Sequence, residues 1–462
     1  MTAPLRPTEL RHRTAPTSEP LPDWALKTFE AYLPYVLGVT EPEHAPLVKQ
    51  ATERFGAYVQ AIPAHERGRD DLWTLLMWTR VHGTFFGGLP VAPWQQSPAR
   101  RERFIRRFYG SDRTAADWVF DKVVSKLPLP QSPTIRDLAK SLREMMGLAF
   151  YTNPNADPIT GYTRIWDRTY PDHPDVDVGR LRATRQPATF DPREVASVHM
   201  QGHPYEVPRL FAYDGRPRVA VIGSGAGGAV TAARLAQTGR YDVAVFESGP
   251  RLNPGRYPLD TLVGMSQLFE SGLLTLSKNL DIHLLRGRLV GGGTVLTSGL
   301  SVEPRAETKD LWCATNGPLS IGVKRDAFDL GIQKVFKRQA LGKIDPRVYT
   351  DASDLLGVGA RKIADSEPWA FDRDVQWNNV MMRHDQRPEP TRDQNGDICS
   401  GCGLCNYGCH FGHKLPIDLP YIADAEPAGA RIHQHLPPEP LDCPPHDGRT
   451  PQTPPAPAPA PH

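Results

Sequence analysis

Apolar residues in the first part of the chain recur at the spacing of an α-helix. Between residues 21 and 150 they return every three or four positions, which places them on one face of each successive helix. Examples on the first such face are Leu26, Phe29, Leu33 and Val36. A further stretch is apolar nearly all round and is expected inside a helical core, with docking to lipid as the alternative. Its aromatic residues are Trp73, Trp78, Phe85 and Phe86. The pattern predicts an all-α domain over residues 21–150.

The helical pattern is flanked by segments of different composition. Residues 1–20 are polar and carry prolines, so they are expected to be disordered. Residues 151–215 are rich in Pro, Asp, Tyr and Arg and show little periodicity, which predicts an extended connector. Residues 436–462 consist largely of Pro-Ala repeats and are expected to form a disordered tail. The remaining segment, residues 216–435, holds the motifs that suggest chemistry.

The strongest motif begins at residue 218, where a short continuous run of apolar residues indicates a buried strand. A short apolar strand is followed by a Gly-x-Gly-x-x-Gly turn, a helix of small residues, and a second strand that closes on an acid. In this dinucleotide fingerprint the first glycine allows a tight turn, the second lets backbone approach a pyrophosphate, and the third lets the helix lie against the sheet. The acid accepts hydrogen bonds from a ribose. The candidate cofactor-binding residues here are Gly223, Ser224, Gly225, Ala226, Gly227, Gly228 and Glu247.

A second glycine cluster lies later in the chain, within residues 286–297. Its glycines would let backbone approach a flat ring, and its N–H groups could face a pyrophosphate or the ring's edge. The candidate residues are Val290, Gly291, Gly292, Gly293 and Thr294. NAD needs only the first glycine turn, whereas a flavin dinucleotide is served by both. The two motifs together predict an α/β, Rossmann-like FAD-binding domain preceded by the all-α domain.

Four of the six cysteines follow one another as C-x2-C-x2-C-x3-C. They are Cys399, Cys402, Cys405 and Cys409. This is the spacing of the bacterial ferredoxin run, although His410 stands where that run has proline, and a single cluster would need a remote ligand such as Cys313 or Cys443. An iron–sulfur cluster, a zinc site and a structural thiol or disulfide loop are therefore the alternatives.

Composition argues against several classes of protein, namely nucleic-acid-binding, membrane-spanning and secreted ones. The 462 residues carry a formal net charge of +2, and 23% of them are charged, which offers no strong field for nucleic acid or an anionic membrane. No run approaches the length of a bilayer span, and the N-terminus lacks the apolar core of a signal peptide. A cytoplasmic location is expected, without a nucleic-acid partner.

Residues 216–433 resemble the FAD-binding half of the glucose–methanol–choline (GMC) oxidoreductases. The resemblance rests on the glycine turn with Glu247, on residues 290–294 followed by Trp312, and on the cysteine–glycine segment 399–414. That last segment is similar to the one in bacterial members and in the long-chain alcohol oxidase branch. Residues 421–432 are similar to the helix and strand that follow it there. The N-terminal region is similar to the small helical subunit of gluconate dehydrogenases, through residues 148–154 and 161–162.

The resemblance implies FAD and oxidation of an alcohol CH–OH group, with a histidine taking the hydroxyl proton while hydride passes to flavin N5. Thr297 stands where many members have Asn after the glycine cluster. No residue matches the motif of the catalytic histidine, so a truncated or frame-shifted product with poor activity on its own is expected. Implied partners are a small alcohol, an electron acceptor, and a separate C-terminal subunit.

Three other functions are compatible with the same motifs. An electron-transfer or assembly subunit would carry FAD or a cluster without substrate chemistry. An NAD-dependent dehydrogenase would use the first glycine turn and leave the second unexplained. An inactive fragment would retain the cofactor fingerprint alone.

Overall fold

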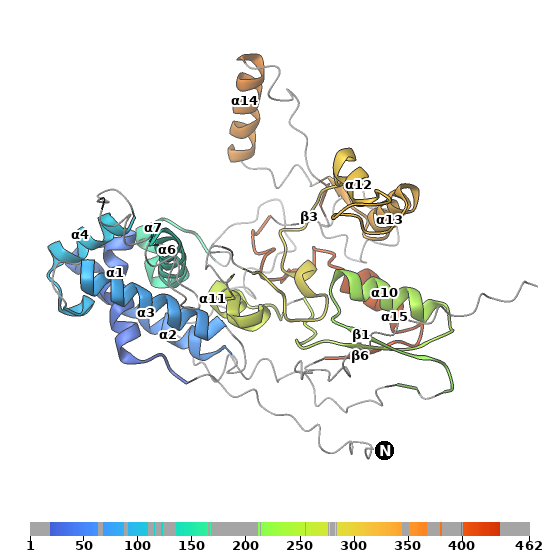
Figure 1. Ribbon diagram of the computed structural model, residues 1–462, viewed down its shortest axis with the longest axis horizontal. Coiled ribbons are helices and arrows are strands. Elements are labelled where there is room, and N and C mark those ends of the chain that lie inside the picture. The colour runs from blue at the N-terminus through green and yellow to red at the C-terminus, as the bar shows by residue number, and fades with distance from the viewer. Residues whose placement is uncertain are drawn as a thin grey trace, which may run out of the picture.

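The computed structural model of the chain describes the following residues: 19–62, 68–86, 91–109, 115, 122, 135–164, 167, 211–212, 214–254, 256–275, 277, 282, 284–343, 351–366, 379–380, 399 and 401–434. Within the described part of residues 19–164, every regular element is helical. The helices are α1 (Asp23–Leu37), α2 (Ala45–Gln60), α3 (Gly68–Phe86), α4 (Pro98–Phe108), α6 (Ile135–Tyr151) and α7 (Asp157–Thr160), with single 3-10 turns between several of them. Figure 1 shows them gathered on one side of the molecule.

The apolar faces predicted from the sequence meet in the core of these helices. Phe29 of α1 stacks on Phe55 of α2, with ring centroids 4.2 Å apart. Leu33 and Met146 are fully buried in the same cluster. The stretch expected to be buried all round is not fully enclosed, because Trp73 of α3 is 44% exposed. The core also takes in Leu262 and Leu274 from the later part of the chain, so the helices share their packing with it.

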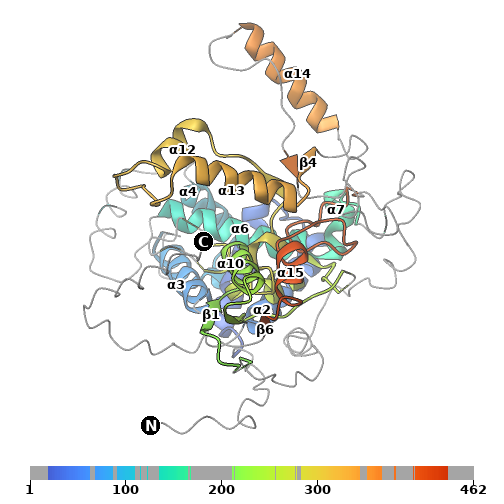
Figure 2. The same ribbon diagram turned by 90° about the vertical axis from the view of Figure 1, so that its right-hand side faces the viewer.

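A three-stranded parallel sheet forms the centre of the second half. Its strands are β1 (Arg218–Ile222), β2 (Asp242–Phe246) and β6 (Arg431–His433), in the order β1-β2-β6. Helix α10 (Ala226–Gln237) connects β1 to β2. It lies beside the short α15 (Ala423–Ala425), above the strands (Figures 1 and 2). Alanines of α10 pack on valines of β1 and β2, which is why this helix needs small residues. The predicted α/β, Rossmann-like fold is confirmed at this sheet.

Short elements fill the space between the helices and the sheet. Helix α11 (Thr261–Leu268) is followed by the turn η5 (Glu270–Leu273), and the second glycine cluster forms the turn η6 (Gly292–Val295). A π-helical turn, η8 (Asp418–Ile422), leads into α15. In Figure 1, α11 lies between the N-terminal helices and the sheet.

A second, antiparallel sheet joins β3 (Leu300–Ser301), β5 (Asn379–Val380) and β4 (Gly342–Lys343). Helices α12 (Ala306–Trp312) and α13 (Arg325–Arg338) lie next to it. Helix α14 (Asp351–Ser366) stands apart from the other elements in both views (Figures 1 and 2).

The predicted N-terminal disorder, most of the connector and the Pro-Ala tail lie outside the described residues. Inside the range expected to form the connector, α6 continues to Tyr151 and α7 follows, so its first residues are helical. Among the helices that the structure describes, none combines the length and the apolar character needed to cross a bilayer.

Candidate dinucleotide site

The first glycine of the fingerprint makes the turn out of β1. Gly223 has a φ of +83°, in the left-handed region that a side chain disfavours. Its N–H donates to the carbonyl of Phe246 at 2.8 Å, so the ends of β1 and β2 stay together at the turn. The carboxyl end of the parallel sheet is therefore fixed where a nucleotide binds in folds of this type.

Helix α10 begins directly after this turn, with Gly225 as its N-cap. The first helical hydrogen bond runs from Ala229 N–H to Gly225 O, at 2.9 Å. The N–H groups of Ala226, Gly227 and Gly228 precede that bond and have no acceptor within the helix. Three such donors at the positive end of the helix dipole form an anion site suited to a pyrophosphate.

Glu247, immediately after β2, organises the loops around this helix start. One of its carboxylate oxygens accepts from Ser224 N–H at 3.0 Å and Ser224 Oγ at 2.7 Å, and the other accepts from Gly249 N–H at 3.0 Å. The side chain is buried, at 5% exposure. Glu247 thus holds the glycine turn in place through hydrogen bonds of its own, in addition to the ribose contact that the fingerprint predicts.

The second glycine cluster comes directly against the first. Gly291 N–H donates to Ser224 Oγ at 3.1 Å, across 67 residues of sequence. Gly292 has a φ of +55°, and a Cβ placed on it would lie 2.9 Å from the Cα of Gly225. The backbones of the two clusters therefore touch, and the contact requires glycine at position 292. The structure brings both predicted groups of cofactor residues into one place.

The other two residues of the second cluster connect it to the rest of the fold. Val290 is buried and donates its N–H to Pro250 O at 2.9 Å. Thr294 donates its hydroxyl to Gly291 O at 2.7 Å and accepts from Ile417 N–H at 3.1 Å. The cluster is therefore attached on one side to the loop after β2 and on the other to the segment before η8.

Asp418 is a site residue that the sequence motifs did not indicate. Its Oδ1 atom is buried and has no hydrogen-bond partner among the described residues. A Cβ placed on Gly291 would lie 2.9 Å from this oxygen. Burial raises the pKa of the Asp418 carboxyl to about 6. A buried oxygen without a partner next to the glycine turns fits a polar group of a bound nucleotide. Nothing in its sequence context distinguishes it from a helix-capping acid.

Lys414 is a second residue that sequence reasoning missed. Its side chain is buried, and its ammonium group donates to the carbonyl oxygens of Val295 at 2.7 Å, Thr297 at 2.5 Å and Cys405 at 2.9 Å. Burial lowers the pKa of Lys414 to about 8. The three carbonyls lie on both the second glycine segment and the cysteine segment. Lys414 therefore joins these two segments as a buried cation.

Replacing Lys414 by methionine is expected to lower the free energy of unfolding at pH 7 by about 2 kcal/mol, because three buried carbonyls lose their donor. The loss should grow at higher pH. Between pH 8 and 10.5 the unfolded chain still holds the Lys414 proton and the folded chain has released it, so wild-type stability rises with pH. Methionine cannot provide this gain. Urea unfolding of both proteins at pH 7 and pH 10 measures the difference, and an equal loss at both values would contradict it.

In the described part of the chain, the four-cysteine segment shows no arrangement that supports a metal site. The segment carries Cys399, Cys402, Cys405 and Cys409, and burial raises the pKa of the Cys402 thiol to about 12. Among the described residues, no group of three or more His, Cys, Asp or Glu side chains is arranged to hold a metal ion. The iron–sulfur and zinc predictions therefore receive no support.

The cysteine segment packs as a loop instead. Cys409 Sγ accepts from His413 N–H at 3.1 Å and Lys414 N–H at 3.3 Å. His410, which replaces the proline of the ferredoxin run, is buried with its Nδ1 3.1 Å from Tyr257 O. Gly408 has a φ of +86° and lies against the ring of Tyr257, where a Cβ would come within 2.1 Å. The glycines of this segment thus allow close packing against the loop that precedes α11.

Comparison with known proteins agrees with this geometry. Residues 221–256 match the family model of the NAD(P)-binding Rossmann-like domain. The chain is 28% identical over 224 residues to an uncharacterized GMC-type oxidoreductase of Mycobacterium tuberculosis, which covers 47% of this chain and 31% of that protein. It is 30% identical over 212 residues to a long-chain-alcohol oxidase of Arabidopsis thaliana, covering 46% and 25% of the two chains. A cholesterol oxidase of Acinetobacter baumannii is 23% identical over 228 residues, covering 46% and 39%.

These matches define how far the similarity extends. The chain spans about a third of the length of the first of these relatives, and a quarter of the alcohol oxidase. The matched stretch amounts to a little under half of this chain in each case. The predicted resemblance to GMC oxidoreductases is confirmed.

Proposed function

The chain is a relative of the GMC-type oxidoreductases, and from this premise we propose that its Rossmann-like unit binds FAD and serves the oxidation of an alcohol CH–OH group. One observation carries the choice of FAD over NAD: the two glycine clusters meet at the start of α10. An NAD site would explain the first cluster alone. A flavin dinucleotide extends from an adenosine to a distant ring and makes use of both.

The residues present are suited to hold such a group. The N–H donors at the start of α10 would bind the pyrophosphate. Glu247 lies beside the same glycine turn, where its carboxylate accepts a hydrogen bond from Ser224 N–H. Asp418 contributes a buried oxygen that has no hydrogen-bond partner among the described residues. When bound, FAD would supply the hydride acceptor. We assign no residue of this chain to removal of the alcohol proton.

The substrate class follows from the relatives. Their names include a long-chain-alcohol oxidase and a cholesterol oxidase, which act on hydrophobic alcohols. We extend this to a hydrophobic alcohol for the present chain, with an electron acceptor as second partner. The division of the chain into a helical unit over residues 21–150 and an FAD unit over residues 216–435 belongs to the same proposal.

FAD retention tests the proposal. Purified chain is incubated with FAD or NAD and passed through a desalting column, and the ligand retained per protein is measured by absorbance. We expect FAD to be retained and NAD to be lost. A wild-type chain that keeps no flavin, or that keeps NAD equally well, would contradict the assignment.

A glycine variant locates the bound flavin. Among the described residues, a Cβ on Gly225 would meet only the Cα of Gly292, at 4.0 Å. Gly225→Ala therefore fits the fold at a cost of about 1 kcal/mol for the poorer N-cap. The added methyl group would occupy the approach of a pyrophosphate to the backbone. FAD affinity is expected to fall at least about ten-fold, the equivalent of 1.4 kcal/mol. Gly331→Ala in α13, where a Cβ has no neighbour within 4 Å, is the matched control and should bind as the wild type.

A further inference from the structure

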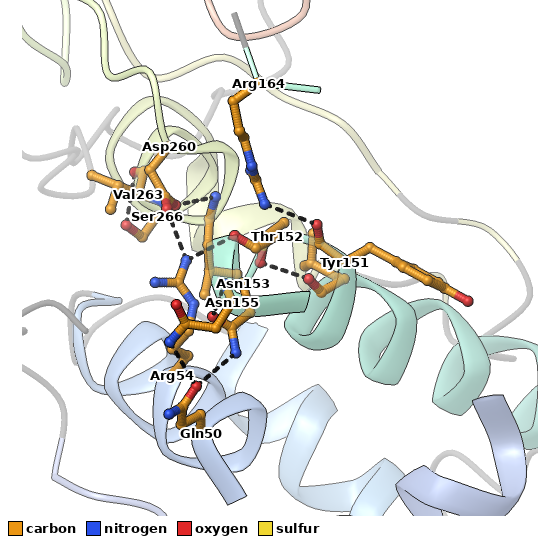
Figure 3. Close-up of polar contacts among 12 residues, drawn as sticks. Gln50, Arg54, Tyr151, Thr152, Asn153, Asn155, Arg164, Asp260, Val263 and Ser266 are labelled. Atoms are coloured by element: carbon orange, nitrogen blue, oxygen red, sulfur yellow. Dashed lines mark hydrogen bonds and ion pairs between the residues drawn. The ribbon is translucent and has the colours of Figure 1, made fainter. Parts of the chain in front are cut away.

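A buried ion pair joins the N-terminal helices to the segment that precedes the dinucleotide site. Arg54 of α2 donates through Nη2 to Asp260 Oδ2 at 2.8 Å, across 206 residues of sequence, and to Thr152 O at 3.3 Å (Figure 3). The side-chain exposures of Arg54 and Asp260 are 0% and 1%. Two charges removed from water in this way hold their partners in one geometry, because neither can be left unpaired at low cost. The pair therefore fixes the relative position of α2, α6 and the start of α11.

Asp260 also caps α11. Its Oδ1 atom accepts from Leu262 N–H at 2.9 Å and Val263 N–H at 3.1 Å. Leu262 belongs to the same apolar cluster as α1, α2 and α6, and Met265 packs against that cluster. Helix α11 is thus built into the core of the N-terminal helices, although it follows β2 in the chain.

The turn after α11 is held by a second contact from α2. Ser271 and Leu273 have φ values of +51° and +69°, which are strained for residues with side chains. Between them, the carbonyl of Gly272 accepts from the hydroxyl of Tyr58, which is buried. Ile62 lies close by, 3.2 Å from where a Cβ of Gly272 would stand. Such a turn persists only where its surroundings fix it, and here α2 does so.

From this turn, backbone hydrogen bonds lead directly to the second glycine cluster. Glu270 N–H donates to Arg286 O at 2.9 Å, and Arg288 N–H donates to Leu268 O at 2.7 Å. Phe269 and Gly287 form an antiparallel bridge. Gly287 in turn lies against Gly292, where a Cβ would come within 2.7 Å of the Gly292 carbonyl carbon. Gly292 is the residue that contacts Gly225 in the first cluster.

We propose that the N-terminal helices position the dinucleotide site: α2, through Arg54 and Tyr58, holds α11 and η5, which hold the second glycine segment against the first. These are positioning residues, since neither touches the site itself. The inference rests on the proposed function for the identity of the ligand, but the order of the glycine segment can be measured without it.

Tyr58→Phe tests the proposal in the full chain, because it removes one hydroxyl and keeps the buried ring. Hydrogen exchange should become faster at the amides of Glu270 and Arg288, and FAD affinity should fall by about five-fold, the equivalent of one buried hydrogen bond. Tyr32→Phe is the matched control, since Tyr32 is equally buried but packs against Phe104 within the helices. It should leave both measurements as in the wild type.

The outcomes separate the two proposals. Unchanged exchange at Glu270 and Arg288 in Tyr58→Phe would overturn the positioning role, whatever the chain binds. Faster exchange at these amides in Tyr58→Phe and not in Tyr32→Phe supports it, even if the wild-type chain retains no flavin, in which case only the ligand assignment fails. Equal acceleration in both variants would mean a general loosening of the helices and would also overturn the positioning role.

Discussion

Alanine at Gly228 is expected to lower the free energy of unfolding by about 3 kcal/mol, whereas alanine at the adjacent Gly227 should raise it by about 0.5–1 kcal/mol. A Cβ on Gly228 would lie 1.9 Å from Gly223 O and 3.3 Å from Val221 Cγ1. The clash is with the backbone of the turn and with β1, neither of which can move without breaking the sheet's edge. At Gly227 a Cβ meets no atom of the described residues within 4 Å, so alanine adds only its better helix propensity.

The two variants differ by one residue in position and not at all in chemistry, which makes them a matched pair. Urea unfolding gives the free-energy difference, provided that the slope of the transition is unchanged. Gly228→Ala should also lose FAD, because pushing α10 away from β1 moves the N–H donors at the start of the helix. Equal stability of the two variants would mean that α10 does not lie against β1 as the structure shows.

The reason that Gly228 could be found from the sequence is that its role is local. Strand, turn, helix and second strand lie within about 30 residues in such a unit, and each glycine has a steric function that no other residue performs. The same holds for Glu247, whose bond with Ser224 spans only 23 positions. For this part of the chain, the sequence predicted the elements, their order and the residues at the turn.

Contacts between distant segments could not be predicted in the same way. The bond between Ser224 and Gly291 crosses 67 positions, and Lys414 Nζ reaches Val295 O across 119. The local sequence does not indicate either pairing, because a lysine is exposed in most proteins and a serine bonds to many groups. Spacing alone did not choose among the alternatives for the cysteines, and the structure shows that the C-x2-C-x2-C-x3-C segment packs against Tyr257 as a loop.

The packing of α11 against the N-terminal helices also could not be predicted from local sequence. Periodicity predicted the helices of the first 150 residues, since an amphipathic face is a local property. It did not predict that α11, more than 100 residues later, completes their core through Leu262. A short helix that carries no sequence motif gives no sign of where it packs. Asp260 caps this helix, and a cap does not identify the partner of its second oxygen.

Breaking the pair between Arg54 and Asp260 should have the largest effect on stability. Arg54→Met leaves a carboxylate buried at 1% exposure without its cation, and we expect the free energy of unfolding to fall by about 3–5 kcal/mol. Asp260→Asn should cost a comparable amount, because it removes the carboxylate that balances the buried guanidinium while asparagine still caps α11. A pair on the surface would cost less than about 1 kcal/mol. Thermal and urea unfolding of the full chain measure the loss and show whether it has the size expected for a buried pair or for a surface pair.

The double variant Arg54→Met/Asp260→Asn decides whether the loss comes from the unpaired charge. Neither charge remains in it, the methionine fills much of the arginine's volume, and the asparagine keeps the cap on Leu262 and Val263. It should therefore be more stable than either single variant, with a coupling energy of at least about 1 kcal/mol between the two positions. Additive losses would mean that the two side chains act independently. In that case the N-terminal helices would be held to α11 by apolar packing around Leu262 alone, and the ion pair would not set their position.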